Sequence, residues 1–80
     1  MEIREILAAN VKRARKAKGL SQEALADKVG IDRTYVSALE RRIHSVSIDM
    51  VARLALALET QPHELLLPPD AGGSSTAASR

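Results

Sequence analysis

Residues 21 to 45 constrain the fold of this chain most, because they contain the signals for two short helices separated by a turn. Ser21 precedes a helical run and can accept a hydrogen bond from an early backbone N–H, as an N-cap residue does. Leu25, Ala26 and Val29 then recur at helical spacing and predict one apolar face. Gly30 follows the last of them, where a left-handed backbone costs glycine little. The pattern predicts a helix over residues 22–29 that ends in a sharp turn.

A second short helix is predicted over residues 33–41. Asp32 is its expected N-cap, since a negative charge suits the positive end of a helix. Val36 and Leu39 are expected to point inward. The outward positions are then Arg33, Thr34, Ser37 and Ala38. A supporting helix followed by a turn and a polar-faced helix is the form of a helix-turn-helix, in which the second helix lies in the DNA major groove.

The rest of the chain predicts three more helices. The first covers about residues 3–18 and ends before Gly19, and the fourth covers about residues 48–58 with Ser47 as its N-cap. A short fifth helix is expected from Pro62 to about Leu66, capped by Thr60 or Gln61. The inward side chains expected of the fourth helix are Ile48, Val51, Leu54, Ala55 and Leu58. We therefore expect an all-α, compact five-helix domain over residues 1–67 and a disordered tail over residues 68–80.

Composition argues against several other classes of protein. The chain of 80 residues has one aromatic residue, Tyr35, and no cysteine, so we expect a small aliphatic core without disulfides or thiolate metal sites. No stretch approaches the roughly 20 apolar residues of a membrane helix, and no signal peptide is recognisable. We expect a cytoplasmic, nucleoid-associated protein. No Ser-His-Asp or metal-ligand spacing occurs, so we expect no catalytic residue, no metal, no cofactor and no enzymatic activity.

Positive charge is concentrated around the predicted helix-turn-helix. Residues 10–42 contain nine Lys or Arg against four Asp or Glu, whereas the remainder contains three against six. Such a concentration favours binding to a polyphosphate. A solvated face of the first helix explains Lys12, Lys16 and Lys18 individually about as well.

Several stretches of the chain together resemble the lambda-repressor-like, Cro/cI (XRE) family of helix-turn-helix proteins. The resemblance covers about residues 5 to 66 and is carried by LSQEALA at 20–26, VGIDRT at 29–34 and VSALER at 36–41. Within the family, the run DRTYVS at 32–37 followed by Glu40 and Arg41 is most like controller proteins of restriction-modification systems. Phage-type repressors and antitoxin-like regulators share much of the pattern and remain alternatives.

The resemblance implies roles in DNA binding for individual residues. It places base-reading residues at Arg33, Thr34, Ser37 and Ala38. Phosphate contact by Arg33, or pairing with Asp32, is the alternative. Expected contacts with the DNA backbone are Ser21, Gln22, Tyr35, Arg41, Arg42, His44 and Ser45. Capping explains Ser21 equally well, exposure alone is the alternative for Gln22, and packing is as good an explanation of Tyr35.

Two further features concern the structure in and around the predicted helix over residues 33–41, which we call the reading helix. The family commonly has glycine near Arg42 and proline near Val46, so Arg42 either occupies a strained left-handed cap or the loop takes a different path. The family also pairs an arginine of the first helix with the glutamate ending the third. This implies a structural, at least partly buried ion pair between Arg15 and Glu40, and Arg15 is then not a full DNA contact.

Apolar residues left over from the core predict a homodimer. They lie in the last two helices: Met50, Leu56, Leu65, Leu66 and Leu67. In the monomeric alternative these leucines only cover the core. The sequence thus predicts a dimeric, sequence-specific regulator that binds double-stranded DNA at a pseudo-palindromic operator, controls its own gene, and blocks or recruits RNA polymerase. A protein-interaction adaptor that uses the same fold is the alternative from another class.

Overall fold

The computed structural model describes residues 2–42 and 45–68. They form four α-helices and a terminal 3-10 helix: α1 (Ile3–Ala17), α2 (Gln22–Val29), α3 (Arg33–Glu40), α4 (Ile48–Leu58) and η1 (Pro62–Leu66). The predicted all-α class is confirmed. The fifth element is a 3-10 helix and not an α-helix, with Gln61 at its N-cap position and Pro62 at its start. The expected tail lies outside the described residues except for Pro68.

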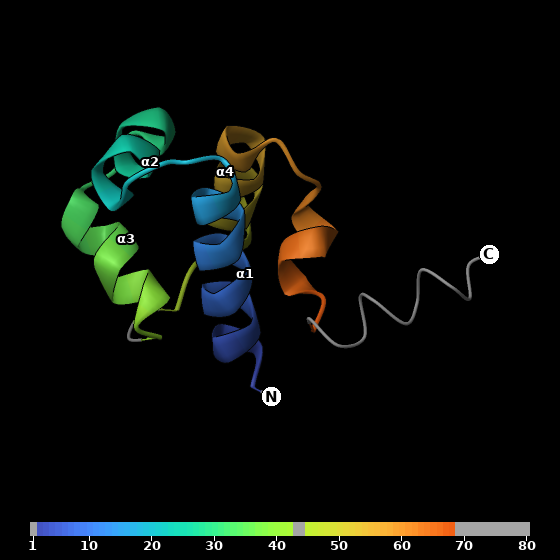
Figure 1. Ribbon diagram of the computed structural model, residues 1–80. Coiled ribbons are helices and arrows are strands. Elements are labelled where there is room, and N and C mark those ends of the chain that lie inside the picture. Colours follow the sequence, from blue (N-terminus) through green and yellow to red (C-terminus); the bar gives the residue numbers. More distant parts are fainter. Residues whose placement is uncertain (1, 43–44, 69–80) are drawn as a thin grey trace.

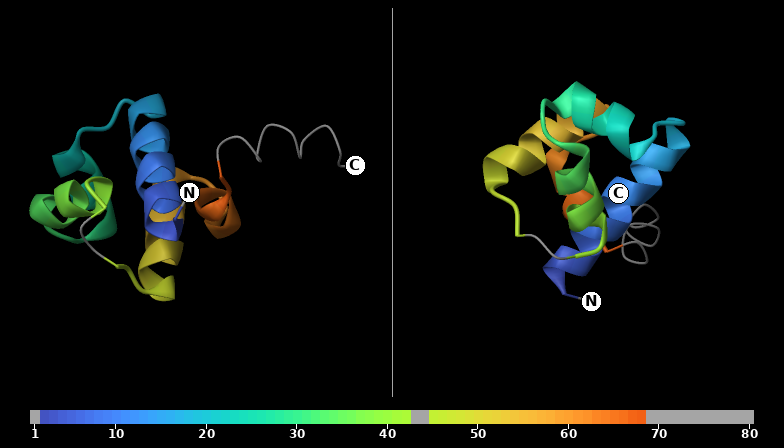
Figure 2. Two further views of the ribbon diagram at one scale, coloured as in Figure 1. Left: turned by 90° about the horizontal axis from the view of Figure 1, so that it is seen from below. Right: turned by 90° about the vertical axis from the view of Figure 1, so that its left-hand side faces the viewer.

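The helices form three groups in space. In Figure 1, α2 and α3 lie on one side of α1 and α4, and η1 lies on the other. The views in Figure 2 give the same order and show α3 crossing the side that faces away from η1. Helices α2 and α3 pack on each other and, respectively, on α4 and α1, whereas η1 packs on α1 and α4. The proposed reading helix is therefore separated from η1 by the body of the domain.

The core is aliphatic and draws on every helix. Its fully buried large side chains are Leu25, Leu54, Leu65, Val11 and Val36. Ile48, which was expected to point inward, is instead 87% exposed, and Ile3 is 55% exposed. Each is the first residue of its helix, and Val46 rather than Ile48 packs against the core at the start of α4. From Val51 onward, the inward positions predicted for α4 are buried, as expected.

Local signals set the turn between α2 and α3 as the sequence indicates. The Ser21 hydroxyl accepts from the Ala24 N–H at 3.0 Å, and Gly30 has a left-handed φ of 84°. Asp32 occupies the N-cap position, but its side chain makes no capping hydrogen bond. Its main-chain carbonyl accepts from the N–H of Tyr35, which is the donor that a capping carboxylate would have bound. Asp32 therefore contributes its backbone and its charge, not a side-chain cap.

Buried Asn10 fastens η1 to α1. Its side-chain amide donates to the carbonyls of Leu65 and Leu67, at 2.8 Å each, and more distantly to Glu64, and Arg13 donates to its amide oxygen. Asn10 is 4% exposed, and these contacts satisfy the carbonyls at the end of a short helix. These hydrogen bonds, which we call the Asn10 clamp, hold the C-terminal end of the described chain against the rest of the domain.

We expect Asn10→Ala to lower the free energy of unfolding by about 1–3 kcal/mol, because it removes the donor from buried carbonyls. Urea denaturation followed by circular dichroism measures this change. Lys12→Ala, an exposed substitution in the same helix, should change stability by less than about 0.5 kcal/mol. Equal and small effects of both substitutions would show that the clamp contributes nothing.

Two exposed carboxylates lie on either side of the join between α4 and η1: Glu59, which binds Lys18 at the end of α1, and Glu64. The Lys18 ammonium hydrogen-bonds to Glu59 at 2.7 Å, and this bond and the lysine charge lower the pKa of Glu59. The Thr60 hydroxyl and then the Gln61 N–H donate to Glu64 and lower its pKa. Because both pKa values are depressed on folding, the contribution of these groups is present at neutral pH and is lost as acid protonates them.

Candidate nucleic-acid interface

The outward face of α3 is polar at its N-terminal end. Arg33 and Thr34 are exposed and Ser37 is half-buried, whereas Val36 and Leu39 belong to the core. All three polar side chains lie within the first five residues of the helix. This is the end of a recognition helix from which side chains reach base edges in the major groove.

Ala38, the fourth expected base-reading residue, does not face outward. Its side chain is 7% exposed. On the neighbouring turns, Thr34 and Arg41 carry longer side chains, so a methyl group between them lies below the surface that they form. The structure corrects this prediction, and the candidate reading set is reduced to Arg33, Thr34 and Ser37.

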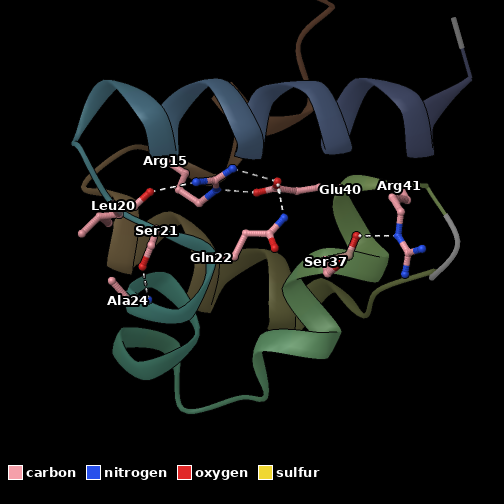
Figure 3. Close-up of polar contacts among 8 residues, drawn as sticks. All are labelled: Arg15, Leu20, Ser21, Gln22, Ala24, Ser37, Glu40 and Arg41. Atoms are coloured by element: carbon pink, nitrogen blue, oxygen red, sulfur yellow. Dashed lines mark hydrogen bonds and ion pairs between the residues drawn. The ribbon is translucent and has the colours of Figure 1, made fainter.

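A hydrogen-bonded network joins the C-terminal end of α3 to α1 and to the start of α2 (Figure 3). Arg15 meets the Glu40 carboxylate with two nitrogens: Nε lies 2.7 Å from Oε2 and Nη2 lies 3.0 Å from Oε1. Its Nη1 donates to the Leu20 carbonyl at 2.8 Å, and Gln22 Nε2 donates to Glu40 Oε1 at 3.1 Å. The side chains of Arg15 and Glu40 are 10% and 4% exposed.

This network joins the elements that a helix-turn-helix must hold in register. It connects α1, the loop before α2, the first residue of α2 and the last residue of α3. A bidentate arginine–carboxylate pair fixes orientation as well as distance. The structure brings Arg15 and Glu40 together as the resemblance implied, and one amide N–H of half-buried Gln22 is used inside the protein.

The segment after α3 presents cations. Arg41 and Arg42 are exposed, and Arg41 Nε donates to the Ser37 carbonyl at 3.4 Å. Arg42 has φ 65°, so this chain adopts the strained left-handed cap and not an ordinary backbone at that position. Ser45 is exposed, while the expected contact His44 lies outside the described residues. Tyr35 is half-buried and packs against the core.

An arginine of α4 supports the turn and was not foreseen from the sequence. Arg53 Nη2 donates to the Val29 carbonyl, the last of α2, at 2.6 Å. A cation is favourable at the carbonyl end of a helix. No local sequence pattern predicts this contact, because 24 residues separate the partners.

The expected dimer residues divide between core and surface. Leu65 is 2% exposed and belongs to the core, so the structure corrects its placement on the surface. Met50 is half-buried against the core, and its place in a dimer interface stays a prediction. Leu56 is 81% exposed, and Leu66 and Leu67 are 39% and 37% exposed. Ile48 and Ile3 add to this apolar surface, and a groove of about 360 Å³ runs beside Ile3, Ile48 and Leu66.

Other kinds of site find no support in the described part of the chain. Among residues 2–42 and 45–68, no group of three His, Cys, Asp or Glu could hold a metal ion. Within the same ranges, no helix has both the length and the apolar character needed to cross a membrane.

The fold defines the class: this is a helix-turn-helix protein. The helix-turn-helix family model matches residues 11–65, and the chain belongs to this family. The predicted resemblance to XRE-type proteins is thereby confirmed.

Relatives in this family are described as regulators. A hypothetical transcription factor of Neisseria meningitidis serogroup B is 44% identical over 68 residues, which is 85% of this chain and 64% of that protein. Control protein C.SmaI of Serratia marcescens is 44% identical over 66 residues, 82% of this chain and 79% of that protein. The chain thus spans slightly under two thirds of the first relative and more of the second.

Solved structures agree with the fold. The crystal structure of the hypothetical transcription factor NHTF from Neisseria has a TM-score of 0.89 and 41% identity, covering 91% of this chain and 84% of that one. The restriction-modification controller protein C.AhdI from Aeromonas hydrophila has a TM-score of 0.75 and 42% identity, covering 78% and 94%. SinR in complex with DNA has a TM-score of 0.73 and 32% identity, covering 76% and 98%. The relatives support a DNA-binding transcription regulator and include controller proteins.

Proposed function

We propose that this protein is a homodimeric, sequence-specific transcriptional regulator that binds a pseudo-palindromic operator beside its own gene. The observation that carries the proposal is the polar N-terminal end of α3, a helix whose other end is fixed to α1 and α2 by the Arg15–Glu40–Gln22 network. A reading helix needs a fixed orientation, because base contacts depend on the placement of a few side chains. The similarity to control proteins and to SinR, which was solved on DNA, supports the same reading.

In this proposal, Arg33, Thr34 and Ser37 contact base edges. Arginine can bind guanine with two parallel hydrogen bonds, and the two hydroxyl side chains can donate to or accept from a base. Ser21, Gln22, Tyr35, Arg41, Arg42 and Ser45 would contact the DNA backbone and set the register of α3 in the groove. Gln22 would do so while still holding Glu40, since its amide has a second N–H.

The proposed dimer surface consists of the exposed side chains Ile3, Ile48, Leu56, Leu66 and Leu67. Two of them lie on α4 eight residues apart, with exposed Ala52 midway between them, so they form one stripe along the helix. A small residue in such a stripe allows a second helix to approach closely. A second copy of the chain would cover apolar area that is unfavourable in water.

We expect Leu56→Glu to raise the dimer dissociation constant by more than about tenfold, because it places a charge where an apolar side chain would be buried. Sedimentation velocity at tens of micromolar measures the mass. Stability of the monomer should not change, since Leu56 is 81% exposed. Lys28→Glu, an exposed change on α2, should leave the mass unchanged. A wild-type monomer at these concentrations would contradict the proposed dimer.

Footprinting of the DNA upstream of the protein's own gene tests the operator itself. Two reading helices related by a two-fold axis should protect half-sites about 34–36 Å apart, one turn of the DNA helix. A single protected half-site would be inconsistent with the dimer.

In this proposal, the protein acts without a cofactor and catalyses no reaction. Bound at the operator it would block or recruit RNA polymerase according to the position of the site. Residues 1–67 would form the DNA-binding and dimerisation domain. Coupled dimerisation and DNA binding would make the response depend steeply on protein concentration. A controller protein of a restriction-modification system is the favoured context, supported by the similarity to C.AhdI.

A further inference from the structure

A cleft of about 380 Å³ lies between α1 and the end of α3. Its basic side chains are Lys12, Arg41 and Arg42, and the methyl groups of Ala8 and Ala9 form part of its wall. Lys12 and the two arginines are exposed. Three exposed cations therefore lie around one open cleft.

Two carboxylates line the same cleft. Glu40 is paired with Arg15, outside the cleft lining, and Glu5 is bound to one of the three cations. Glu5 Oε2 lies 2.9 Å from Arg42 Nη1, and the side chains are 36% and 55% exposed. The other oxygen, Oε1, accepts from the Glu2 N–H at 3.0 Å and closes the capping box that begins α1. Glu5 is therefore held in place by the helix terminus, and its charge faces the left-handed Arg42.

We propose that the cleft binds one phosphate of the DNA backbone and that Glu5 competes with this phosphate for Arg42. The proposal rests on the proposed function, because it names a ligand of the same DNA-binding surface. An exposed ion pair is weak, so a phosphate brought by the bound duplex can displace it. The pair still lowers affinity for DNA, since Arg42 must leave one anion to bind the other. Glu5 thereby limits binding without contacting a base.

The test is DNA affinity of Glu5→Gln, measured by fluorescence anisotropy on an upstream duplex and on a scrambled duplex. Glutamine keeps the size of the side chain and the capping box, which accepts either residue, and replaces the charged oxygen that faces Arg42 by an uncharged NH2 group. Affinity should rise about two- to fivefold, in line with the strength of an exposed pair. The rise should be similar on both duplexes, because a phosphate contact carries no sequence information.

Two further variants separate this competition from a general effect of charge. Glu2→Gln removes the charge of a neighbouring carboxylate, which accepts from the Arg4 N–H and not from Arg42. It should raise the affinity for DNA less than Glu5→Gln does. In an Arg42→Gln background, Glu5→Gln should raise affinity hardly at all. Equal thermal unfolding of all variants excludes an effect of folding.

Three results would overturn the proposal: no rise or a fall with Glu5→Gln, an equal rise with Glu2→Gln, or an undiminished rise in the Arg42→Gln background. A fall would mean that Glu5 positions Arg42 for DNA. The outcome is independent of operator specificity, because the rise is read on either duplex. If the wild-type protein shows no preference for the upstream duplex, the proposed function fails, while the competition for Arg42 is still decided.

Discussion

Replacing Arg15 with alanine will lower the free energy of unfolding by about 3–5 kcal/mol, because it leaves the Glu40 carboxylate buried without its charged partner. The Glu40 side chain is 4% exposed and would keep only the amide of Gln22 as a donor. The substitution also removes the donor to the Leu20 carbonyl. For a domain of this size the loss is a large part of the total stability.

Urea denaturation of Arg15→Ala and of a matched control measures this loss. The control is Lys18→Ala, at the C-cap of the same helix, which breaks an ion pair of the same 2.7 Å length but one whose glutamate is 69% exposed. Solvent screens such a pair, so the control should unfold close to the wild-type midpoint. Similar and small shifts for both variants would mean that burial of the Arg15–Glu40 pair has no energetic consequence.

Replacing Arg33 with alanine will weaken binding to the operator by about 10- to 100-fold, the discrimination expected of a bidentate contact with guanine. Arg33 is exposed at the first position of α3, so the variant should fold as the wild type does. Binding to scrambled DNA should fall much less, since only one positive charge is lost there. Anisotropy titrations on the two duplexes give both values.

Arg33→Lys separates base reading from charge. Lysine keeps the charge but lacks the planar fork of donors, so specific binding should remain weak while non-specific binding recovers. Full recovery of operator binding by lysine, or an equal loss on both duplexes with alanine, would mean that Arg33 contacts phosphate.

Local signals predicted the elements that carry the reading helix. The Ser21 cap and the left-handed Gly30 depend on residues next to them in the chain, and both stand where the sequence placed them. The Arg15–Glu40 pair came from resemblance to a family, since no periodicity links residues 25 positions apart. The roles of Arg33, Thr34 and Ser37 toward DNA remain predictions.

The errors fall where a local pattern does not determine the surroundings. Helix α3 has only eight residues, or about two turns. Its helical period therefore does not predict the burial of Ala38, which depends on the side chains around it. Five residues with a helical pattern do not distinguish a 3-10 helix from an α-helix, and Leu65 was placed on the surface although η1 buries it. Arg53 and Asn10 act on main-chain carbonyls of distant segments, which leave no trace in the pattern of side chains.

Sequence-specific DNA binding is the central claim, and fluorescence anisotropy of the wild-type protein tests it most directly. The probes are a duplex from directly upstream of the protein's own gene and a scrambled duplex, each at low and at physiological salt. We predict tight binding to the upstream duplex alone that survives physiological salt. Equal binding to both duplexes that vanishes as salt rises would contradict the claim, because it would reflect only attraction to phosphate.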